Sequence, residues 1–417
     1  MPKAPKPNKI LRFCILLLVV LFTACPPPPP TPTPPSKPPP AVVPPPVLQR
    51  LTPAQLPLFG DDLDYQGLDN GIAMSLVYLK RLPAGQNVAF GTDRFSVAQM
   101  IRTLEAFRAL VAERPDLERL NQVLGQRFRV YRAAGNDQHG TVLYTGYYEP
   151  TLDGSAKPGP RFPVPIHSRP SDLVTIDLSL FAPDLRGRRI TGRYTGHTVV
   201  PYPERSLIRS DPDFDRLAPP IAWLHDPVDL LILQIQGSGK VRLQNGQELQ
   251  VQFDGSNGQP YRSIGRLLIA QGKITAAQMS MQAIRTYLRN NPREVDAILD
   301  HNPRYIFFRR ASRGPFGALG VPLTPRRSIA IDRRIFPAGA LAYVATPMPQ
   351  TDPAGHITGW GPYGGFVLAQ DTGSAITGPG RVDLFMGDGL EAEVAAGHLK
   401  HEGALYFLVL KTDEDPP

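Results

Sequence analysis

The chain has 417 residues, of which 42% are apolar and 20% are charged, with 45 Lys and Arg against 37 Asp and Glu. This length suggests two domains, and the apolar content is enough for a packed core. Two cysteines exclude a disulfide-stapled scaffold and a zinc site built from two Cys pairs. Part of the net charge of +8 lies in a basic leader, so the composition gives weak grounds for nucleic-acid binding and we expect no such partner.

Residues 1–24 are typical of a secretory signal peptide. Residues 1–12 are basic, and residues 13–24 form the only long apolar run of the chain. That run is about half of the ~20 residues needed to span a bilayer, which excludes a polytopic membrane protein.

The end of the leader resembles a bacterial lipobox. Thr23 and Ala24 are small residues directly before Cys25, although Phe22 stands where such motifs usually have Leu. The pattern predicts a lipidated Cys25 as the new N-terminus, and ordinary cleavage or an uncleaved anchor are the alternatives. Because Pro26 is not the Asp that commonly retains a lipoprotein at the inner membrane, we expect the periplasmic face of the outer membrane.

Residues 25–49 are interpreted as the lipidated Cys and a Pro-rich linker. Residues 26–46 contain 14 of the 48 prolines, so they cannot pack a core. At ~3.1 Å per residue in polyproline II, they would reach about 65 Å. A stiff stalk and an ordinary linker are both possible, and either places the start of the folded body near residue 50.

Two segments of the body have helical periodicity. Apolar residues recur every three or four positions in residues 96–120, with a break expected before Pro115. Residues 274–289 show the same spacing, which Pro292 ends.

The remaining segments are predicted to be short strands. They are rich in β-branched and aromatic residues and are bounded by Gly, Pro and Asp. Without alternating β and α units, such strands favour barrels or sandwiches, so the expected fold class is mainly β. The predicted strands are residues 230–237, 247–253, 328–336, 340–346, 364–371 and 404–411.

Several kinds of catalytic site are absent from the sequence. The eight histidines form no HExxH or paired ligand spacing, so we expect no metal. The body has no Cys nucleophile, GxSxG, P-loop or GxGxxG motif, so no organic cofactor is expected either.

Carboxylates are better candidates. Asp371 follows an apolar strand at a Gly-containing turn, and Asp383 lies between apolar residues that should raise its pKa by desolvation. A raised pKa suits a general acid. Asp332 is a third acid after an apolar segment, and each of the three could instead serve in a turn or cap. The DTGS at residues 371–374 also raises an aspartic-protease hypothesis, but that chemistry needs a second such motif or a dimer.

A polar cluster is predicted where a strand ends in a flexible turn. Gln234, Gln236 and Ser238 place amides and a hydroxyl beside Gly237, which suits a sugar with hydroxyl and N-acetyl groups. Aromatic faces for stacking could come from Tyr144, Tyr147 and Tyr148. A strand edge with a tight turn and core tyrosines is the alternative.

Taken together, these motifs resemble the membrane-bound lytic murein transglycosylase A family, glycoside hydrolase family 102. Asp332, Asp371 and Asp383 resemble the three acids of its "three-aspartate" region. The matching stretches are residues 144–150, 233–239, 261–274, 279–288, 302–309, 330–339 and 370–397.

The resemblance implies a double-psi β-barrel domain, from residues 50–147 and 300–412. A smaller β-barrel domain, residues 148–299, is inserted into it, and the groove between the two binds a glycan strand. Residues 413–417 are expected to be a tail.

The resemblance also implies site residues. It places the catalytic acid on Asp383 and a supporting acid on Asp371. Ser374 replaces a Gly of many relatives and the spacer through residues 379–380 is one residue longer, which could alter the loop geometry. The expected substrate-binding residues are Tyr147, Thr145, Gln236, Gly237, Ser238 and Asp332.

The implied activity is lytic cleavage of the β-1,4 bond between N-acetylmuramic acid and N-acetylglucosamine in peptidoglycan, with 1,6-anhydromuramoyl ends as products. We expect a monomer that binds glycan strands, contacts the membrane through its lipid anchor, and needs neither metal nor cofactor. The alternatives are an inactive peptidoglycan-binding lipoprotein, or a hydrolase in which Asp371 positions a water.

Overall fold

The computed structural model describes residues 46–412, except residues 186 and 353. The predicted signal peptide, Cys25, nearly all of the linker and the tail therefore lie outside the described residues. Within the described part of the chain, no helix is both long enough and apolar enough to cross a membrane.

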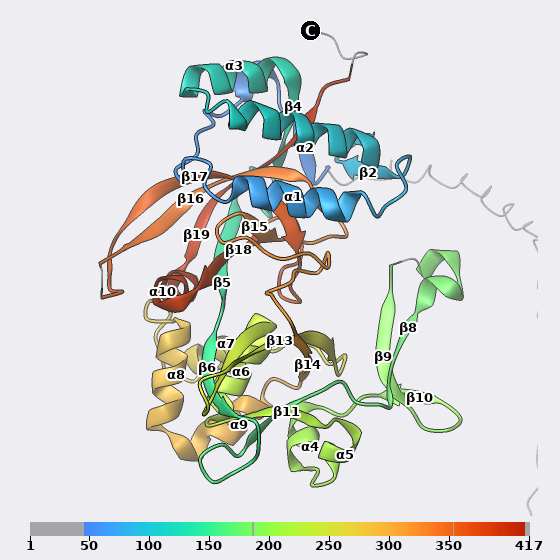
Figure 1. Cartoon of the computed structure of the whole chain (residues 1–417), viewed down its shortest axis with the longest axis vertical. Helices are drawn as coiled ribbons and strands as arrows, with labels where there is room; N and C mark the ends of the chain where they lie inside the picture. Colours follow the sequence, from blue (N-terminus) through green and yellow to red (C-terminus); the bar gives the residue numbers. More distant parts are fainter. Residues whose placement is uncertain (1–45, 186, 353, 413–417) are drawn as a thin grey trace, which may run out of the picture. The chain divides into compact units, whose positions relative to one another are not determined.

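A closed six-stranded barrel forms one half of the body (Figure 1). Its strand order is β19-β16-β17-β15-β18-β5, and the ring closes because β5 also pairs with β19. The edge of β19 continues into β4 (Phe128–Ala133) and β1 (Leu48–Arg50). The barrel strands are β5 (Val142–Glu149), β15 (Ser328–Ala330), β16 (Leu341–Thr351), β17 (Ile357–Asp371), β18 (Arg381–Asp388) and β19 (Lys400–Leu410).

A second sheet is made from the chain between β5 and β15, which we call the insert region (residues 150–311). Its six strands follow the order β14-β13-β12-β6-β11-β7, and one isolated bridge between Ser168 and Phe308 joins the two edges. The mainly β fold class with two barrel-like sheets is therefore confirmed. The strands are β6 (Thr151–Ser155), β7 (Val164–His167), β11 (Pro220–Leu224), β12 (Ser238–Leu243), β13 (Glu248–Ser256) and β14 (Ile306–Ala311).

The boundary predicted at residue 299 assigns β14 to the barrel, but the strand pairs with β13 of the insert region. The described part of the chain also contains two small sheets. They consist of β2 (Asn87–Phe90) and β3 (Asp93–Ser96), and of β8 (Leu173–Asp177), β9 (Arg189–Tyr194) and β10 (Val199–Pro201).

Four helices belong to the barrel half: α1 (Leu68–Leu79), α2 (Val97–Ala112), α3 (Leu117–Arg127) and α10 (Gly389–His398). The Ser96 hydroxyl accepts the Gln99 N–H and caps α2, and the break before Pro115 separates α2 from α3, as predicted. Six helices belong to the insert region: α4 (Arg205–Ser210), α5 (Phe214–Leu217), α6 (Pro227–Gln236), α7 (Ile264–Ala270), α8 (Met281–Asn290) and α9 (Val295–Asp300).

The strand predicted at residues 230–237 is wrong, because this segment forms helix α6. The Asp226 carboxylate caps its N-terminus by accepting the Val228 N–H, Pro227 occupies the first turn, and Gly237 ends it at φ +81°. The apolar run is buried on nearly all sides, and such a run fits a strand and a buried helix equally well. The sequence signal for a helix is Asp226 followed by Pro227, a typical N-cap residue followed by a first-turn proline.

The helix predicted at residues 274–289 begins later, at Met281, where the Ser280 hydroxyl accepts the Ala283 N–H. It ends at Asn290, close to the predicted stop. The strand predicted at residues 328–336 is likewise shorter and ends at Ala330.

A buried ion pair fixes the chain before α1 to the barrel. The Arg327 guanidinium donates to both oxygens of Asp61, at 2.6 and 2.8 Å, and to the carbonyls of Gln66 and Phe366. Both side chains are almost completely enclosed. Three clusters of buried apolar side chains form the cores of the two halves. All of their residues lie at or after Leu48, so residues 47–417 contain these cores.

Candidate active site

The two candidate acids lie on one line across the barrel wall. Asp371 ends β17 and Asp383 lies in β18, and both pair with Ala330 of the short strand β15 between them. Neighbouring strands are about 4.8 Å apart, so the two Cα atoms lie roughly 10 Å apart. Gln370 is the extra residue of a β-bulge directly before Asp371, a feature that often re-aims a side chain beside an active site.

Asp383 is held by a hydroxyl from the next strand. The Thr145 Oγ1 of β5 donates to Asp383 Oδ1 at 2.8 Å. Burial, with a smaller contribution from the charge of Asp371, raises the pKa of Asp383 to about 6. The Thr145 hydrogen bond and the Arg381 charge oppose this increase. A carboxyl with this pKa can both donate and accept a proton near neutral pH.

Asp371 accepts three hydrogen bonds. The Tyr147 hydroxyl donates to its Oδ2, and the N–H groups of Ala318 and Thr372 donate to its Oδ1, each at 2.8 Å. Burial raises the pKa of Asp371, whereas these donors lower it by favouring the carboxylate. Burial and the two acids raise the pKa of Tyr147, so the phenol keeps its proton and remains a donor.

Both acids line a cavity of about 880 Å³ between the barrel and the insert region. Residues 371–376 and Asp383 form the barrel side, whereas residues 234–238 belong to the insert side. The volume lies within the range of ordinary ligand sites, which is about 300–1,000 Å³.

The other predicted site residues fall into two groups. Gln236, Gly237, Ser238 and Tyr147 line the cavity, with the first three at the end of α6 and the start of β12 rather than on a strand. Gln236 also accepts the Tyr148 N–H through Oε1 at 3.0 Å. Thr145 contacts Asp383 and lines a smaller adjoining hollow of about 240 Å³.

Asp332 does not line the cavity. Its carboxylate accepts the Arg334 guanidinium at 2.6 and 2.9 Å and the Gly378 N–H at 2.9 Å. These donors lower the pKa of Asp332 to about 2. The contact with Gly378 fixes the loop that follows Asp371. Tyr144 and Tyr148 are buried outside the cavity, so of the three candidate tyrosines only Tyr147 faces it.

Sequence analysis missed two parts of the cavity. Phe316, Gly317, Ala318, Gly320 and Leu323 line it, and the Ala318 N–H contacts Asp371. The glycines of this segment were the only signal for a close backbone approach. Arginines of the insert side were also missed, because nothing in their sequence neighbourhood separates them from surface arginines.

No three His, Cys, Asp or Glu side chains among residues 46–412, leaving out the two undescribed positions, are grouped to hold a metal ion. The histidines also contribute no side chain to the cavity. The ionisable side chains that line the cavity are carboxylates, phenols and guanidinium groups.

Two family models match the chain. The first, described as the MltA specific insert domain, matches residues 143–309. The second, described as the 3D domain, matches residues 327–409, which include all three aspartates.

Membrane-bound lytic murein transglycosylase A of Escherichia coli strain K12 is 32% identical over 285 residues, which cover 68% of this chain and 69% of that protein. The crystal structure of a membrane-bound lytic murein transglycosylase from Agrobacterium tumefaciens matches with a TM-score of 0.71 and 30% identity over 87% of this chain and 97% of that chain. The E. coli structure with bound chitohexaose matches with a TM-score of 0.68 and 25% identity over 88% and 95%. The resemblance seen in the sequence is thus confirmed, and the chain belongs to the membrane-bound lytic murein transglycosylase A family.

Proposed function

We propose that the chain is a lytic transglycosylase that cleaves the β-1,4 bond between N-acetylmuramic acid and N-acetylglucosamine in peptidoglycan. One observation carries the mechanism: Asp383 is a partly buried carboxyl with a pKa of about 6 that lines an 880 Å³ cavity. The names of the relatives and the chitohexaose bound in the E. coli protein support a glycan as the ligand.

Asp383 serves twice in this mechanism. Protonated Asp383 donates its proton to the oxygen of the scissile bond, and N-acetylglucosamine leaves with it. The Asp383 carboxylate then takes the proton of the C6 hydroxyl, and O6 attacks C1 of the same sugar. The 1,6-anhydro ring forms without water, and the carboxyl is protonated again. Because nucleophile and electrophile belong to one sugar, proximity favours this attack.

Asp371 supports the reaction as a carboxylate. Its three donors, Tyr147, Ala318 and Thr372, favour the charged form against the effect of burial. A fixed negative charge at this edge of the cavity offsets the positive charge that develops on the sugar ring.

The remaining site residues bind the sugar or position the groups that act on it. Gln236, Gly237 and Ser238 face the sugar from the insert side, where an amide and a hydroxyl suit acetamido and hydroxyl groups. Thr145 orients Asp383, and Asp332 fixes the loop through Gly378.

We also propose that Cys25 is lipidated after removal of residues 1–24, that the enzyme acts as a monomer, and that it faces the periplasm from the outer membrane. The relatives named membrane-bound support an envelope location. The linker predicted for residues 25–49 must end before Leu48, because Leu48–Arg50 form β1 and pair with β4. No cofactor or metal enters the mechanism.

Mass spectrometry of the products from purified peptidoglycan tests the activity, with residues 47–417 and the Asp383→Asn variant in parallel. Anhydromuramoyl ends from the unmodified protein alone are expected. Reducing ends would make it a hydrolase and assign Asp371 to positioning water. No products with retained glycan binding would leave a binding lipoprotein.

A further inference from the structure

Three arginines line the insert side of the cavity: Arg205 in α4, Arg304 before β14, and Arg309 in β14. We call them the arginine wall. The carboxylates that line the same cavity, Asp371 and Asp383, belong to the barrel side. The two sides of the cavity therefore carry opposite charges.

Arg205 is a buried cation without a carboxylate partner in the described part of the chain. Its side chain is among the largest that are fully enclosed, and the residue is only 2% exposed. Its Nε and Nη2 donate to the carbonyls of Asn302 at 2.9 Å and Arg304 at 2.6 Å, and its guanidinium lies 5.4 Å from the centre of the Tyr305 ring. Burial lowers its pKa to about 10, so it remains charged at neutral pH.

Arg304 is half-buried and, like Arg205, donates to a backbone carbonyl instead of a carboxylate. Its Nη1 donates to the carbonyl of Gln259 at 3.1 Å, and it makes no ion pair with any residue that the structure describes. Burial lowers its pKa as well. Arg309 is more exposed and approaches Asp254 only at 3.8 Å. Uncompensated cations with restricted hydration stabilise a fold poorly, whereas they attract an anionic ligand.

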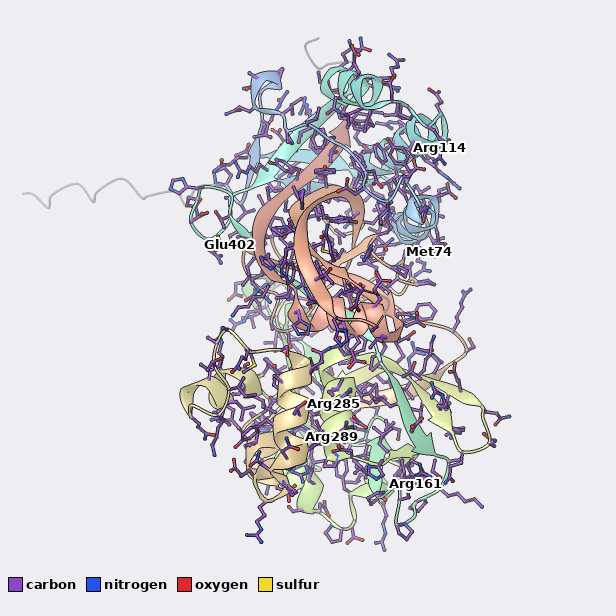
Figure 2. All side chains as sticks on the ribbon, turned by 90° about the vertical axis from the view of Figure 1, so that its left-hand side faces the viewer. Met74, Arg114, Arg161, Arg285, Arg289 and Glu402 are labelled. Carbon is purple, nitrogen blue, oxygen red and sulfur yellow. The ribbon has the colours of Figure 1, made fainter. Side chains whose placement is uncertain are left out.

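Two arginines of the insert region outside the cavity are paired with acids. Arg285 and Arg289 lie one turn apart on α8 (Figure 2). Arg285 is 3.0 Å from Glu393, and Arg289 is 3.4 Å from Asp226. Arg205 and Arg304 differ from this pair, because they line the cavity and donate to backbone carbonyls instead of carboxylates.

The arginine wall belongs to the insert side of the cavity, whereas the catalytic acid belongs to the barrel side. The charges that shift the pKa of Asp383 are those of Arg381 and Asp371. A ligand group bound at the wall can therefore belong to the same glycan strand as the bond that Asp383 protonates, because both sides line one 880 Å³ cavity.

We propose, resting on the function proposed above, that the arginine wall binds a carboxylate carried by the substituent of a muramoyl residue. In intact strands the lactyl carboxyl is joined to the peptide by an amide bond, so the available carboxylates are those of the stem peptide. In strands without stems, the lactyl carboxylate is free. Guanidinium groups match a carboxylate through two parallel hydrogen bonds, and neutral sugars offer no such partner. The wall selects peptidoglycan over uncharged chitin-like glycans.

Three substrates test this proposal with residues 47–417. They are intact peptidoglycan strands, the same strands with their carboxylates converted to carboxamides, and strands from which an amidase has removed the stem peptides. The quantity measured is the ratio of kcat/KM for the first or third substrate to that for the carboxamide strands. Arg304→Gln and Arg309→Gln are the variants. Arg310→Gln is the matched control, because it is adjacent on β14, donates to the carbonyl of Ile221 and does not line the cavity.

We expect the unmodified protein to prefer a carboxylate-bearing substrate by about tenfold or more, the effect of one charge-assisted contact. The two variants should reduce that ratio towards one, and the control should keep it. A preference for intact strands identifies the stem peptide as the source, whereas a preference for stem-free strands identifies the lactyl group.

The proposal would be overturned if the variants lost kcat/KM equally on all three substrates, because the ratio of carboxylate to carboxamide strands would then be unchanged. If the unmodified protein cleaves none of the substrates, the proposed function fails instead. In that case the ratio of the equilibrium binding constants for intact and carboxamide strands decides whether the wall recognises carboxylates. Arg205 is left unchanged in this test, because its enclosed side chain also holds the carbonyls of Asn302 and Arg304.

Discussion

The two sides of the cavity are built differently. On the barrel side, Asp371 and Asp383 sit on paired strands and each accepts a hydrogen bond of 2.8 Å from β5. On the insert side, Gln236 and Ser238 flank the turn between α6 and β12, and the polar side chains are amides, hydroxyls and arginines. Groups that move protons need a fixed geometry and shifted pKa values. A closed sheet fixes the geometry and also buries the carboxyls. We therefore expect substitutions on the barrel side to change kcat, and those on the insert side to change KM.

Asp383→Asn should give the largest effect. The amide cannot donate or accept the proton, and general acid–base catalysis contributes up to about 10⁴-fold, so kcat should fall by roughly 10³- to 10⁴-fold. Binding of glycan strands should remain within about twofold in a pull-down with intact peptidoglycan. An exposed acid outside the cavity, Asp153, provides the matched control as Asp153→Asn. Turnover of Asp383→Asn within tenfold of the unmodified protein would move the catalytic acid elsewhere.

Asp371→Asn should lower kcat by about 10²-fold, because it removes a preorganised charge from the transition state. It should also shift the pH profile. The charge of Asp371 raises the pKa of Asp383, so its removal lowers that pKa. Since the first step needs protonated Asp383, the fall in rate on the alkaline side should then begin at a lower pH. A profile of kcat/KM against pH that moves the other way would contradict the proposed coupling.

The contrast between the two sides also explains what could be predicted from the sequence. Asp371 and Asp383 were found because each follows a local pattern of apolar residues and glycine. Their alignment depends on β15, a strand of three residues that pairs with both β17 and β18, and no local pattern encodes such a pairing. The family resemblance supplied the barrel, whereas strand counting alone indicated only a mainly β fold.

The insert side was predicted less well. The run before Gly237 satisfies both helix and strand patterns, and packing on all sides decides for the helix. Arg205 resembles a surface residue in the sequence, because its burial arises from a segment almost 100 positions away that contains Asn302 and Arg304. Contacts of this range can be read only from the folded chain.

Ser238→Ala should change KM, whereas the variants of the barrel side should change kcat. Ser238 lines the cavity at the start of β12, and loss of one hydroxyl contact to the sugar costs about 0.5–1.5 kcal/mol. We expect KM to rise by roughly three- to tenfold with kcat within twofold. Thermal unfolding serves as the control for the fold. A loss confined to kcat would show that the insert side takes part in the chemical step.

Thr145→Val should have the smallest effect and a sign opposite to that of Asp371→Asn. The Thr145 hydroxyl favours the Asp383 carboxylate, so its removal raises the pKa of Asp383 and moves the alkaline fall in rate to a higher pH, by less than about one unit. Thr145→Ser keeps the donor and should leave the profile in place, which separates the hydrogen bond from packing. Because the two shifts oppose each other, the double variant Thr145→Val/Asp371→Asn should return the midpoint towards its original pH while keeping the low kcat of Asp371→Asn. A midpoint that stays displaced in the double variant would mean that the two groups do not act on the same carboxyl.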